Sequence, residues 1–538
     1  MTDWNYADVW ETVADTVPHA PALVHGDRRL SWADVERRAN GVAAALLDAG
    51  AQRQDKVAHY LYNCPEYLES TFAIVKVGLV PVNTNYRYTD DELVYLWDNA
   101  EAVAVIFHGS FTERIEGLRD RVPGVRQWLW VDDGAGPCPA WATPYEAAAE
   151  SHPDRTVAPW GRSGDDLYLL YTGGTTGMPK GVMWRQDDLF ARLNAGNFIR
   201  VPEDGGLEGV RNVLTGPGPV HLPACPLMHG TGSFTSMAAL AIGGCVVTLT
   251  NRRFDPVELL DTVDRENVNV VAIVGDAFAK PILAALDEHP GRWRLSTLLA
   301  FVSSGVMWSE ETKRGMLEHK PTMLLVDAFS SSEALGMGTS VSSGTEAQAT
   351  ARFTLNDDVR VIDPETGKDV VAGSGEVGAL ALRGRNPVGY YRDEAKSAAT
   401  FKEIDGARYA IPGDYATVSA EGVIQLLGRG SVVINTGGEK VFPEEVEEVL
   451  KLHPAVRDAV AVAIPDDRFG QVVAAVVECR DGAEATESEL VEHVRGRLAA
   501  FKAPKRVRFV PTIGRSPAGK VDYARLRTET TDWAAAAV

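Results

Sequence analysis

A loop rich in glycine and threonine, ending in a single lysine, is the segment with the clearest capacity for chemistry. Residues 171–181 read Tyr-Thr-Gly-Gly-Thr-Thr-Gly-Met-Pro-Lys-Gly and follow an apolar run, 167–170, that is typical of a buried strand. Glycines let backbone N–H groups approach a polyphosphate, threonine hydroxyls add donors, and Lys180 adds positive charge. We therefore predict that this loop binds ATP. A plain glycine-rich turn is the alternative, but such a turn needs neither three threonines nor a lysine.

The loop differs from the phosphate-binding loop of kinases and GTPases. That motif needs Gly-Lys followed by Ser or Thr at the start of a helix. Here Pro179 precedes the lysine and Gly181 follows it. A phosphotransferase of that class is therefore disfavoured.

The elements that must position this loop alternate between helical and strand patterns. Residues 32–49 have helical spacing after a Ser31 cap, and residues 66–77 form a second predicted helix. Predicted strands include 56–62, 102–107, 270–274 and 323–326. This alternation predicts an α/β fold whose sheets are largely covered.

The pattern changes after Gly428, where a smaller unit begins. Helices are predicted over 444–452 and 487–501. Predicted strands of this unit are 456–464, 472–478 and 507–510. We predict an N-terminal domain at 1–430 that binds ATP and the acyl group, and a small mobile α+β domain at 431–538.

Length and composition exclude several classes of protein. The chain has 538 residues and a net charge of −21, so a general surface for nucleic acid or anionic membrane is not expected. The five cysteines are scattered, which predicts neither a disulfide framework nor a zinc site. We see no signal peptide and no apolar run near the ~20 residues of a transmembrane segment, and we predict a cytoplasmic protein. A homodimer is one assembly that we consider.

Further segments along the chain contain residues that suit the binding of ATP. They are Pro226-Leu-Met-His-Gly, Ser303-Ser-Gly, Asp327-Ala-Phe-Ser-Ser-Ser-Glu, Gly413-Asp, the run 431–447 and Arg515-Ser-Pro-Ala-Gly-Lys. With residues 171–181 they resemble the motifs of the adenylate-forming acyl-CoA synthetase superfamily, whose members activate carboxylic acids with ATP. The resemblance covers nearly the whole chain. It implies a large N-terminal multi-sheet adenylation domain and a small mobile α+β C-terminal domain.

Some stretches narrow the resemblance to one part of that superfamily. The segments 82–88, 181–185 and 409–415 look like those of actinobacterial fatty-acyl and steroid-side-chain CoA ligases. The resemblance therefore implies ATP, CoA and a hydrophobic carboxylic acid as substrates, with Mg²⁺ as cofactor.

The segment 327–333 is similar to the family's aromatic-Gly-x-Thr-Glu motif. By that resemblance Phe329 stacks on adenine, Asp327 lies near its exocyclic amine and Ser332 lies near phosphate. Glu333 would hold Mg²⁺, a task that suits a hard carboxylate oxygen. Phe329 replaces the usual Tyr and Ser330 the usual Gly, which leaves the local backbone geometry open.

Two further positions match ribose contacts of the family. Asp414 would accept hydrogen bonds from both ribose hydroxyls, and Arg429 would be a second ribose contact. The full set of predicted ATP-binding residues is Thr172, Gly173, Gly174, Thr175, Thr176, Lys180, Ser304, Gly305, Asp327, Ala328, Phe329, Ser332, Asp414, Arg429 and Lys520.

The resemblance also implies residues for the acyl group and for CoA. Amino-acid-activating relatives commonly have Asp near the position of His229, which argues against an amino-acid substrate. A bulky hydrophobic acid is modestly favoured over a medium-chain or aryl acid. The predicted acyl- and CoA-binding residues are His229, Val274, Gly275, Gly305, Gly336, Gly437, Gly438 and Lys440.

Lys520 matches the adenylation lysine of the family. With Thr172, Lys180 and Glu333 it forms the predicted catalytic set. In this scheme the C-terminal domain rotates about Ser431 after adenylation, which withdraws Lys520 and presents the Gly437–Gly438 pair to the CoA thiol.

The sequence therefore predicts an acid–thiol ligase that forms AMP and pyrophosphate. Two alternatives stay open. One is an adenylating enzyme that passes its acyl group to a carrier-protein thiol or an amine. The other is a nucleotide or acyl sensor on the same fold, although such proteins tend to lose the charged residues that this chain retains.

Overall fold

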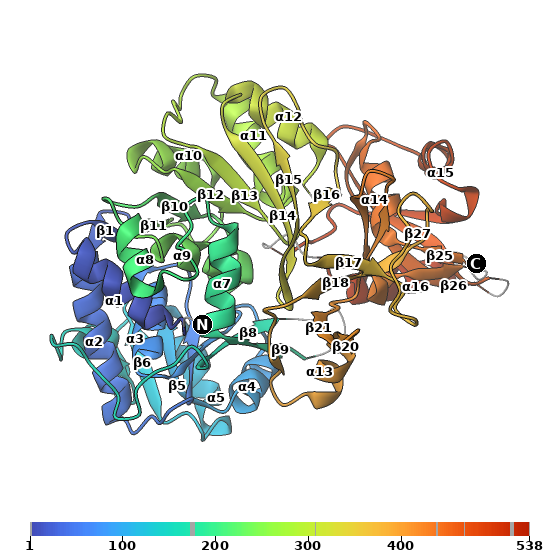
Figure 1. Cartoon of the computed structure of the whole chain (residues 1–538). Coiled ribbons are helices and arrows are strands. Elements are labelled where there is room, and N and C mark those ends of the chain that lie inside the picture. Colours follow the sequence, from blue (N-terminus) through green and yellow to red (C-terminus); the bar gives the residue numbers. More distant parts are fainter. Residues whose placement is uncertain are drawn as a thin grey trace. The chain divides into compact units, whose positions relative to one another are not determined.

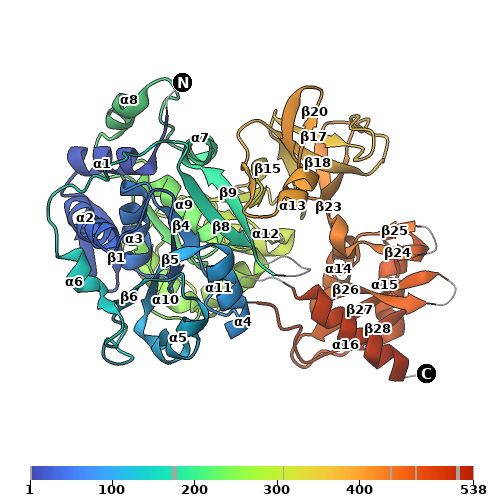
Figure 2. The ribbon, with the colours of Figure 1, turned by 90° about the horizontal axis from the view of Figure 1, so that it is seen from below.

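A computed structural model of the chain describes residues 3–172, 178–306, 308–436, 439–466, 469–516 and 521–536. These residues form two compact units (Figures 1 and 2). We call them unit 1, residues 3–172, 178–350 and 383–410, and unit 2, which contains 351–382 and the described residues from 411 onward. The boundary between residues 430 and 431 stays a prediction about domains.

The first sheet of unit 1 is mainly parallel. Its strands run in the order β2-β1-β11-β10-β12-β13-β14-β15. Every pairing from β1 to β14 is parallel, and the outer strands β2 and β15 are antiparallel. The strands are β1 (Pro21–His25), β2 (Arg28–Ser31), β10 (Val220–Pro223), β11 (Cys245–Thr248), β12 (Val270–Ile273), β13 (Ala300–Ser303), β14 (Leu324–Ser331) and β15 (Ala334–Ser342).

The second sheet of unit 1 has eight strands in the order β19-β9-β8-β4-β3-β5-β6-β7. Strands β9 and β19 are antiparallel to their neighbours, and the others are parallel. The strands are β3 (Lys56–Tyr60), β4 (Val80–Asn83), β5 (Ala102–His108), β6 (Gln127–Val131), β7 (Thr143–Pro144), β8 (Leu167–Thr172), β9 (Lys180–Arg185) and β19 (Gly389–Tyr390). Strands β20 (Phe401–Ile404) and β21 (Ala407–Ala410) form an antiparallel hairpin.

Helices cover both sheets of unit 1 and create three apolar layers. One core lies between the sheets, with α1, α2, α3 and α9 in it; the others lie under α10–α12 and under α4–α5. The helices are α1 (Tyr6–Thr16), α2 (Trp32–Asp48), α3 (Pro65–Lys76), α4 (Asp90–Asn99), α5 (Thr112–Leu118), α6 (Tyr145–Ala149), α7 (Gln186–Gly196), α8 (Gly206–Val213), α9 (Gly230–Leu240), α10 (Pro256–Arg265), α11 (Asp276–Glu288), α12 (Glu310–His319) and α13 (Glu394–Thr400). The predicted Ser31 cap is confirmed as part of a capping box with Asp34.

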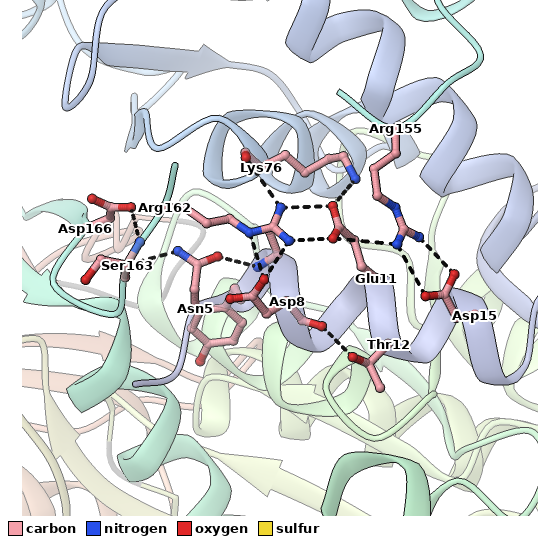
Figure 3. Close-up of polar contacts among 12 residues, drawn as sticks. Asn5, Asp8, Glu11, Thr12, Asp15, Lys76, Arg155, Arg162, Ser163 and Asp166 are labelled. Atoms are coloured by element: carbon pink, nitrogen blue, oxygen red, sulfur yellow. Dashed lines mark hydrogen bonds and ion pairs between the residues drawn. The ribbon is translucent and has the colours of Figure 1, made fainter. Parts of the chain in front are cut away.

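A buried network of charges ties α1 to the segment that leads into β8 (Figure 3). The ammonium of Lys76, whose side chain is 0% exposed, lies 2.6 Å from Glu11 and 2.9 Å from Glu36. Arg162 donates to Glu11 and Asp8 from the segment just before β8. Buried charges are tolerated when each has a partner, so this network fixes the approach to β8 without leaving a bare charge.

Unit 2 contains an antiparallel sheet in the order β16-β23-β22-β18, with β17 paired to β18. Its strands are β16 (Arg352–Leu355), β17 (Val359–Ile362), β18 (Gly378–Arg383), β22 (Asp414–Val418) and β23 (Val423–Arg429). A second, five-stranded sheet has the order β25-β24-β27-β26, with β28 on β27. Its strands are β24 (Ile434–Thr436), β25 (Glu439–Val441), β26 (Val456–Asp466), β27 (Gly470–Cys479) and β28 (Arg506–Phe509).

Alternating side chains let the second sheet of unit 2 bury both faces. Ala459, Ala461 and Ala463 of β26 pack in the core that includes α14 (Pro443–Lys451) and α15 (Glu487–Arg495). The intervening Val460 and Val462 face the core formed with α16 (Tyr523–Ala536). The predicted helix over 487–501 is too long, because α15 ends at a Gly496 C-cap and only a short 3₁₀ turn, Ala500–Lys502, follows.

Candidate active site

The carboxyl ends of β12, β13 and β14 lie side by side in unit 1. Ile273 is in register with Ser303, and Ser303 with Asp327. The backbone N–H of Gly275 donates a hydrogen bond of 2.9 Å to Oγ of Ser303, which joins the first two strand ends. Ligands of parallel sheets bind at this edge, so the predicted residues on these strand ends share one location. They are Val274, Gly275, Ser304, Gly305, Asp327 and Ala328.

The segment that contains His229 and Thr231, which we call the acyl-side segment, lies near the end of β13. Gly305 has φ +95°, a left-handed conformation that favours glycine. A Cβ added there would lie 3.9 Å from both Thr231 Oγ1 and Val274 Cγ1. Thr231 belongs to the first turn of α9, and His229 is the N-cap residue of that helix. The structure therefore brings His229, Val274 and Gly305 into one neighbourhood.

Asp327 is paired with a lysine that the sequence did not identify. Its Oδ2 lies 3.4 Å from Nζ of Lys313 on α12, and both side chains are buried. At this separation the contact is an ion pair and makes no standard hydrogen bond. Burial raises the pKa of Asp327 to about 6, although the nearby ammonium acts in the opposite direction. Asp327 thus presents a carboxylate at neutral pH on the strand that carries Phe329.

The departures noted at Phe329 and Ser330 have a structural consequence. Phe329 is buried, and the pairing of β14 with β15 shifts register between Phe329 and Ser331. Oγ of Ser330 accepts a hydrogen bond of 2.9 Å from the backbone N–H of Gly336, which has φ +75°. The Ser that replaces Gly therefore stabilises the hairpin by a side-chain contact.

Ser332 and Glu333 form the turn between β14 and β15, and two aromatic side chains hold it. Nε1 of Trp184 on β9 donates 3.0 Å to the carbonyl of Ser332. The hydroxyl of Tyr390 on β19 donates 2.7 Å to Oε1 of Glu333, which is 8% exposed. Glu333 is thus fixed by a residue that the sequence did not single out.

The surroundings of Glu333 fit a magnesium ion better than a protein-only metal site. Within the described ranges no three His, Cys, Asp or Glu side chains gather to hold a metal. Mg²⁺ is commonly held by one or two carboxylates together with substrate phosphates and water. Glu333 is a single buried carboxylate next to β9, the strand that begins with Lys180, and one such carboxylate matches that donor set.

The phosphate-loop strands place Thr172 opposite Lys180. These two residues pair across β8 and β9. The ammonium of Lys180 forms a close ion pair with Oδ2 of Asp393 at the start of α13, a partner that sequence reasoning also missed. Four predicted loop residues lie outside the described part of the chain: Gly173, Gly174, Thr175 and Thr176.

Asn83 connects the phosphate-loop strand to the acyl-side segment. Its Nδ2 donates 2.8 Å to the carbonyl of Tyr171 and 2.7 Å to the carbonyl of Met228. Its Oδ1 accepts 2.6 Å from the backbone N–H of Tyr171. Asn83 therefore links the start of the loop to the residue before His229. A buried polar residue at the end of a strand was the available sequence signal.

Unit 2 carries the predicted ribose residues on adjacent strands. Asp414 of β22, 6% exposed, is in register with Arg429 of β23. The backbone N–H of Gly430 donates 2.9 Å to the carbonyl of Gly413, which closes this strand end. The two backbones are thus adjacent, while the side chain of Arg429 is outside the described part.

For the predicted CoA and adenylation residues of unit 2, the structure describes mainly their neighbours in the sequence. Gly437, Gly438 and Lys520 lie outside the described residues, and so does the side chain of Lys440. Before Lys520, Arg515 is held by Asp458 through hydrogen bonds of 2.6 and 2.9 Å.

No helix in the described ranges is both long and apolar enough to span a bilayer.

Comparison with known proteins places the chain in a family. Residues 10–391 match the AMP-binding enzyme family, and residues 445–520 match the AMP-binding enzyme C-terminal domain. The chain is 41% identical to a 3-oxocholest-4-en-26-oate–CoA ligase of Rhodococcus rhodochrous, over 98% of this chain and 96% of that protein. It is 41% identical to a medium/long-chain-fatty-acid–CoA/3-oxocholest-4-en-26-oate–CoA ligase of Mycolicibacterium smegmatis, over 96% of this chain and 95% of that protein.

A solved structure agrees with this fold. The crystal structure of the anthranilate CoA ligase AuaEII in complex with anthranoyl-AMP matches 99% of both chains, with a TM-score of 0.83 and 22% identity. The predicted α/β architecture, a large multi-sheet N-terminal part with a smaller C-terminal part, is confirmed. From the family matches and the full-length relatives, the chain belongs to the AMP-binding enzyme family.

Proposed function

We propose that this enzyme joins a hydrophobic carboxylic acid to CoA in two half-reactions that use ATP. The family and the full-length relatives make the chain an AMP-forming acyl-CoA synthetase, an acid–thiol ligase. The structural observation that carries the proposal is the convergence of Lys180, Glu333 and the carboxyl ends of β13 and β14 within unit 1. This arrangement would give one nucleotide an ammonium group, a fixed carboxylate and the aromatic ring of Phe329 on β14.

In the first half-reaction, a carboxylate oxygen of the acid attacks the α-phosphorus of ATP. The bond to the bridging oxygen breaks, pyrophosphate leaves and an acyl-adenylate forms. Negative charge grows on the phosphate oxygens, so positioning and electrostatic stabilisation supply the catalysis. We assign Lys180 and Thr172 to the phosphates and Phe329 to the adenine.

Glu333 is the residue that we assign to Mg²⁺, which when bound would neutralise phosphate charge. Asp414 and Arg429 are our assignments for the ribose. The remaining phosphate donors are Gly173, Gly174, Thr175, Thr176 and Ser332, and Ser304, Gly305, Asp327 and Ala328 complete the adenine side. Asp327 is supported by its carboxylate on the strand that carries Phe329.

In the second half-reaction, the CoA sulfur attacks the acyl carbonyl and AMP leaves as the thioester forms. We assign Lys520 to adenylation only, and Gly437, Gly438 and Lys440 to the path of CoA. A rotation about Ser431 would exchange the two sets. The basis for this assignment is the resemblance of these segments to family motifs.

The substrate that we propose is a long or ring-bearing hydrophobic acid. The two full-length relatives act, by their names, on a steroid acid and on medium- or long-chain fatty acids. Two of the predicted acyl-binding residues agree, since a Cβ added at Gly305 would lie 3.9 Å from a methyl carbon of Val274, so glycine leaves space beside an apolar side chain. His229 stands where amino-acid-activating relatives commonly carry Asp. We also propose a cytoplasmic location.

The experiment that tests this proposal is ATP–pyrophosphate exchange with individual acids. Purified enzyme, MgATP and labelled pyrophosphate would be mixed with a steroid side-chain acid, a long-chain, a medium-chain or an aryl acid. We expect exchange that depends on the acid and is strongest with the steroid or long-chain compound. Exchange with the aryl acid alone would contradict the proposed substrate, and no exchange with any acid would contradict adenylation.

A further inference from the structure

One short segment of unit 1 contacts both groups assigned to the polyphosphate. It runs from Tyr390 at the end of β19 to Asp393 just before α13. Tyr390 donates to Glu333 at 2.7 Å, and Asp393 pairs with Lys180. Backbone pairing of Tyr390 with Val182 fixes the same segment against β9. The segment is therefore held beside β9, the strand that begins with Lys180.

Asp393 performs two separate tasks with its two carboxylate oxygens. Oδ1 accepts a hydrogen bond of 2.9 Å from the backbone N–H of Lys396 and so caps α13. Oδ2 faces the ammonium of Lys180. Asparagine caps a helix as well as aspartate does, so the cap alone does not require a charge. The only ion pair of Asp393 within the described residues is the one with Lys180, so its charge serves that contact first.

The exposure of the pair argues against a purely structural role. The side chain of Lys180 is 40% exposed and that of Asp393 is 26% exposed. Ion pairs as open as this contribute little to folding stability. The hydrogen bond from Lys180, with that from Lys396, lowers the pKa of Asp393, so this group is a carboxylate at neutral pH. A half-exposed ammonium held by one carboxylate is free to exchange that partner for another anion.

We propose that Asp393 is the counter-ion of Lys180 in the nucleotide-free enzyme. When ATP binds, the ammonium of Lys180 leaves Asp393 and pairs with the polyphosphate. This inference rests on the proposed function, because it takes Lys180 as a phosphate-binding group. Phosphate oxygens and the Asp393 carboxylate carry the same sign of charge, so they compete for the ammonium. Asp393 is thus a positioning residue that holds the ammonium of Lys180 at the start of β9 and sets the affinity for ATP.

The test compares binding of ATP and AMP by calorimetry, with Mg²⁺ present and no acid substrate. Asp393→Asn keeps the helix cap and removes the competing charge, so we expect ATP to bind roughly two- to fivefold more tightly. AMP lacks the β- and γ-phosphates, and its affinity should stay unchanged. Asp255→Asn is the matched control, since Asp255 caps α10 in the same way and forms its hydrogen bonds of 2.8 and 3.3 Å with backbone N–H groups only.

The same substitution in an enzyme without the Lys180 charge separates two explanations. One is exchange of the ion-pair partner of Lys180, and the other is direct repulsion between Asp393 and the phosphates. In Lys180→Gln enzyme, Asp393→Asn should change ATP affinity by a clearly smaller factor than in the native background. An equal factor in both backgrounds, or an equal change for AMP and ATP, would overturn the proposal. Unchanged ATP affinity in Asp393→Asn would overturn it as well. If the native enzyme binds no ATP at all, the proposed function fails together with this inference.

Discussion

The hydroxyl of Tyr390 donates a hydrogen bond of 2.7 Å to Oε1 of Glu333, across 57 positions of sequence. This contact fixes one oxygen of a buried carboxylate and leaves Oε2 to serve another partner. The next aromatic residue, Tyr391, donates instead to Glu101 at an exposed position. The two adjacent tyrosines thus each donate to a glutamate, Tyr390 to a buried one and Tyr391 to an exposed one.

Tyr390→Phe should weaken catalysis through Glu333. Hydrogen bonds to charged groups contribute about 1.5–3 kcal/mol, so we expect the rate of pyrophosphate exchange to fall by roughly ten- to hundredfold. Mn²⁺ binding in the presence of a non-hydrolysable ATP analogue, followed by electron paramagnetic resonance, should weaken as well. Tyr391→Phe is the matched control and should retain native rate and metal affinity. Equal losses in both variants would contradict the role of Tyr390.

Lys520→Ala should separate the two half-reactions. If this lysine acts only in adenylation, exchange should fall by roughly 10²–10³, the scale of removing one transition-state donor. Thioester formation from a supplied acyl-adenylate should be much less affected. Rapid-quench assays of each half-reaction would measure both rates. Losses of the same size in the two half-reactions would reject the assignment.

Asn83→Ala should destabilise unit 1 and disturb the loop. The substitution leaves two carbonyls and one N–H without their side-chain partner, and buried polar groups without partners are costly. We expect a loss of roughly 3 kcal/mol in the free energy of unfolding, measured by urea denaturation. The exposed Asn251→Ala is the control and should change stability by about 0.5 kcal/mol or less. A native-like Asn83→Ala protein would show that these contacts do not hold the loop.

The sequence was informative about local elements and about motifs. Apolar runs located β12, β14 and the strand before the phosphate loop, and the Ser31 cap located α2, because these features depend on neighbouring residues. The contacts of Lys180 with Asp393 and of Glu333 with Tyr390 span 213 and 57 positions. No periodicity reports such pairings, since they arise from strand order in the sheets.

The same limit applies to the buried lysine behind Asp327. Lys313 lies in a helix with several charged neighbours, and its sequence pattern is that of a solvated face. Only the packing of α12 against the first sheet places it beside Asp327. The length of α15 was also overestimated, because helical spacing continued beyond the residue where Gly496 ends the helix.

His221 should make the protein sensitive to acid. Burial lowers its pKa to about 4, below the ordinary value of 6.5, and Nε2 lies 3.0 Å from Oγ1 of Thr235. Its stabilising contribution is therefore fully present above pH 6.5 and is lost as the pH falls through about 4. Between pH 7 and pH 4 the native protein should lose roughly 3 kcal/mol more unfolding free energy than His221→Gln.

Urea denaturation at each pH would measure this difference. The exposed His152→Gln is the control, and its stability should follow that of the native protein across the range. If His221→Gln and the native protein had parallel pH profiles, burial of His221 would not be a source of acid sensitivity.

The most direct test of the central claim is product analysis of the complete reaction. Enzyme, MgATP, CoA and a steroid side-chain or long-chain fatty acid would be incubated, and the products followed by mass spectrometry. The account predicts equal amounts of AMP, pyrophosphate and acyl-CoA, with none formed when the acid is left out. Pyrophosphate and acyl-adenylate without any thioester would show that CoA is not the acceptor and would contradict the account.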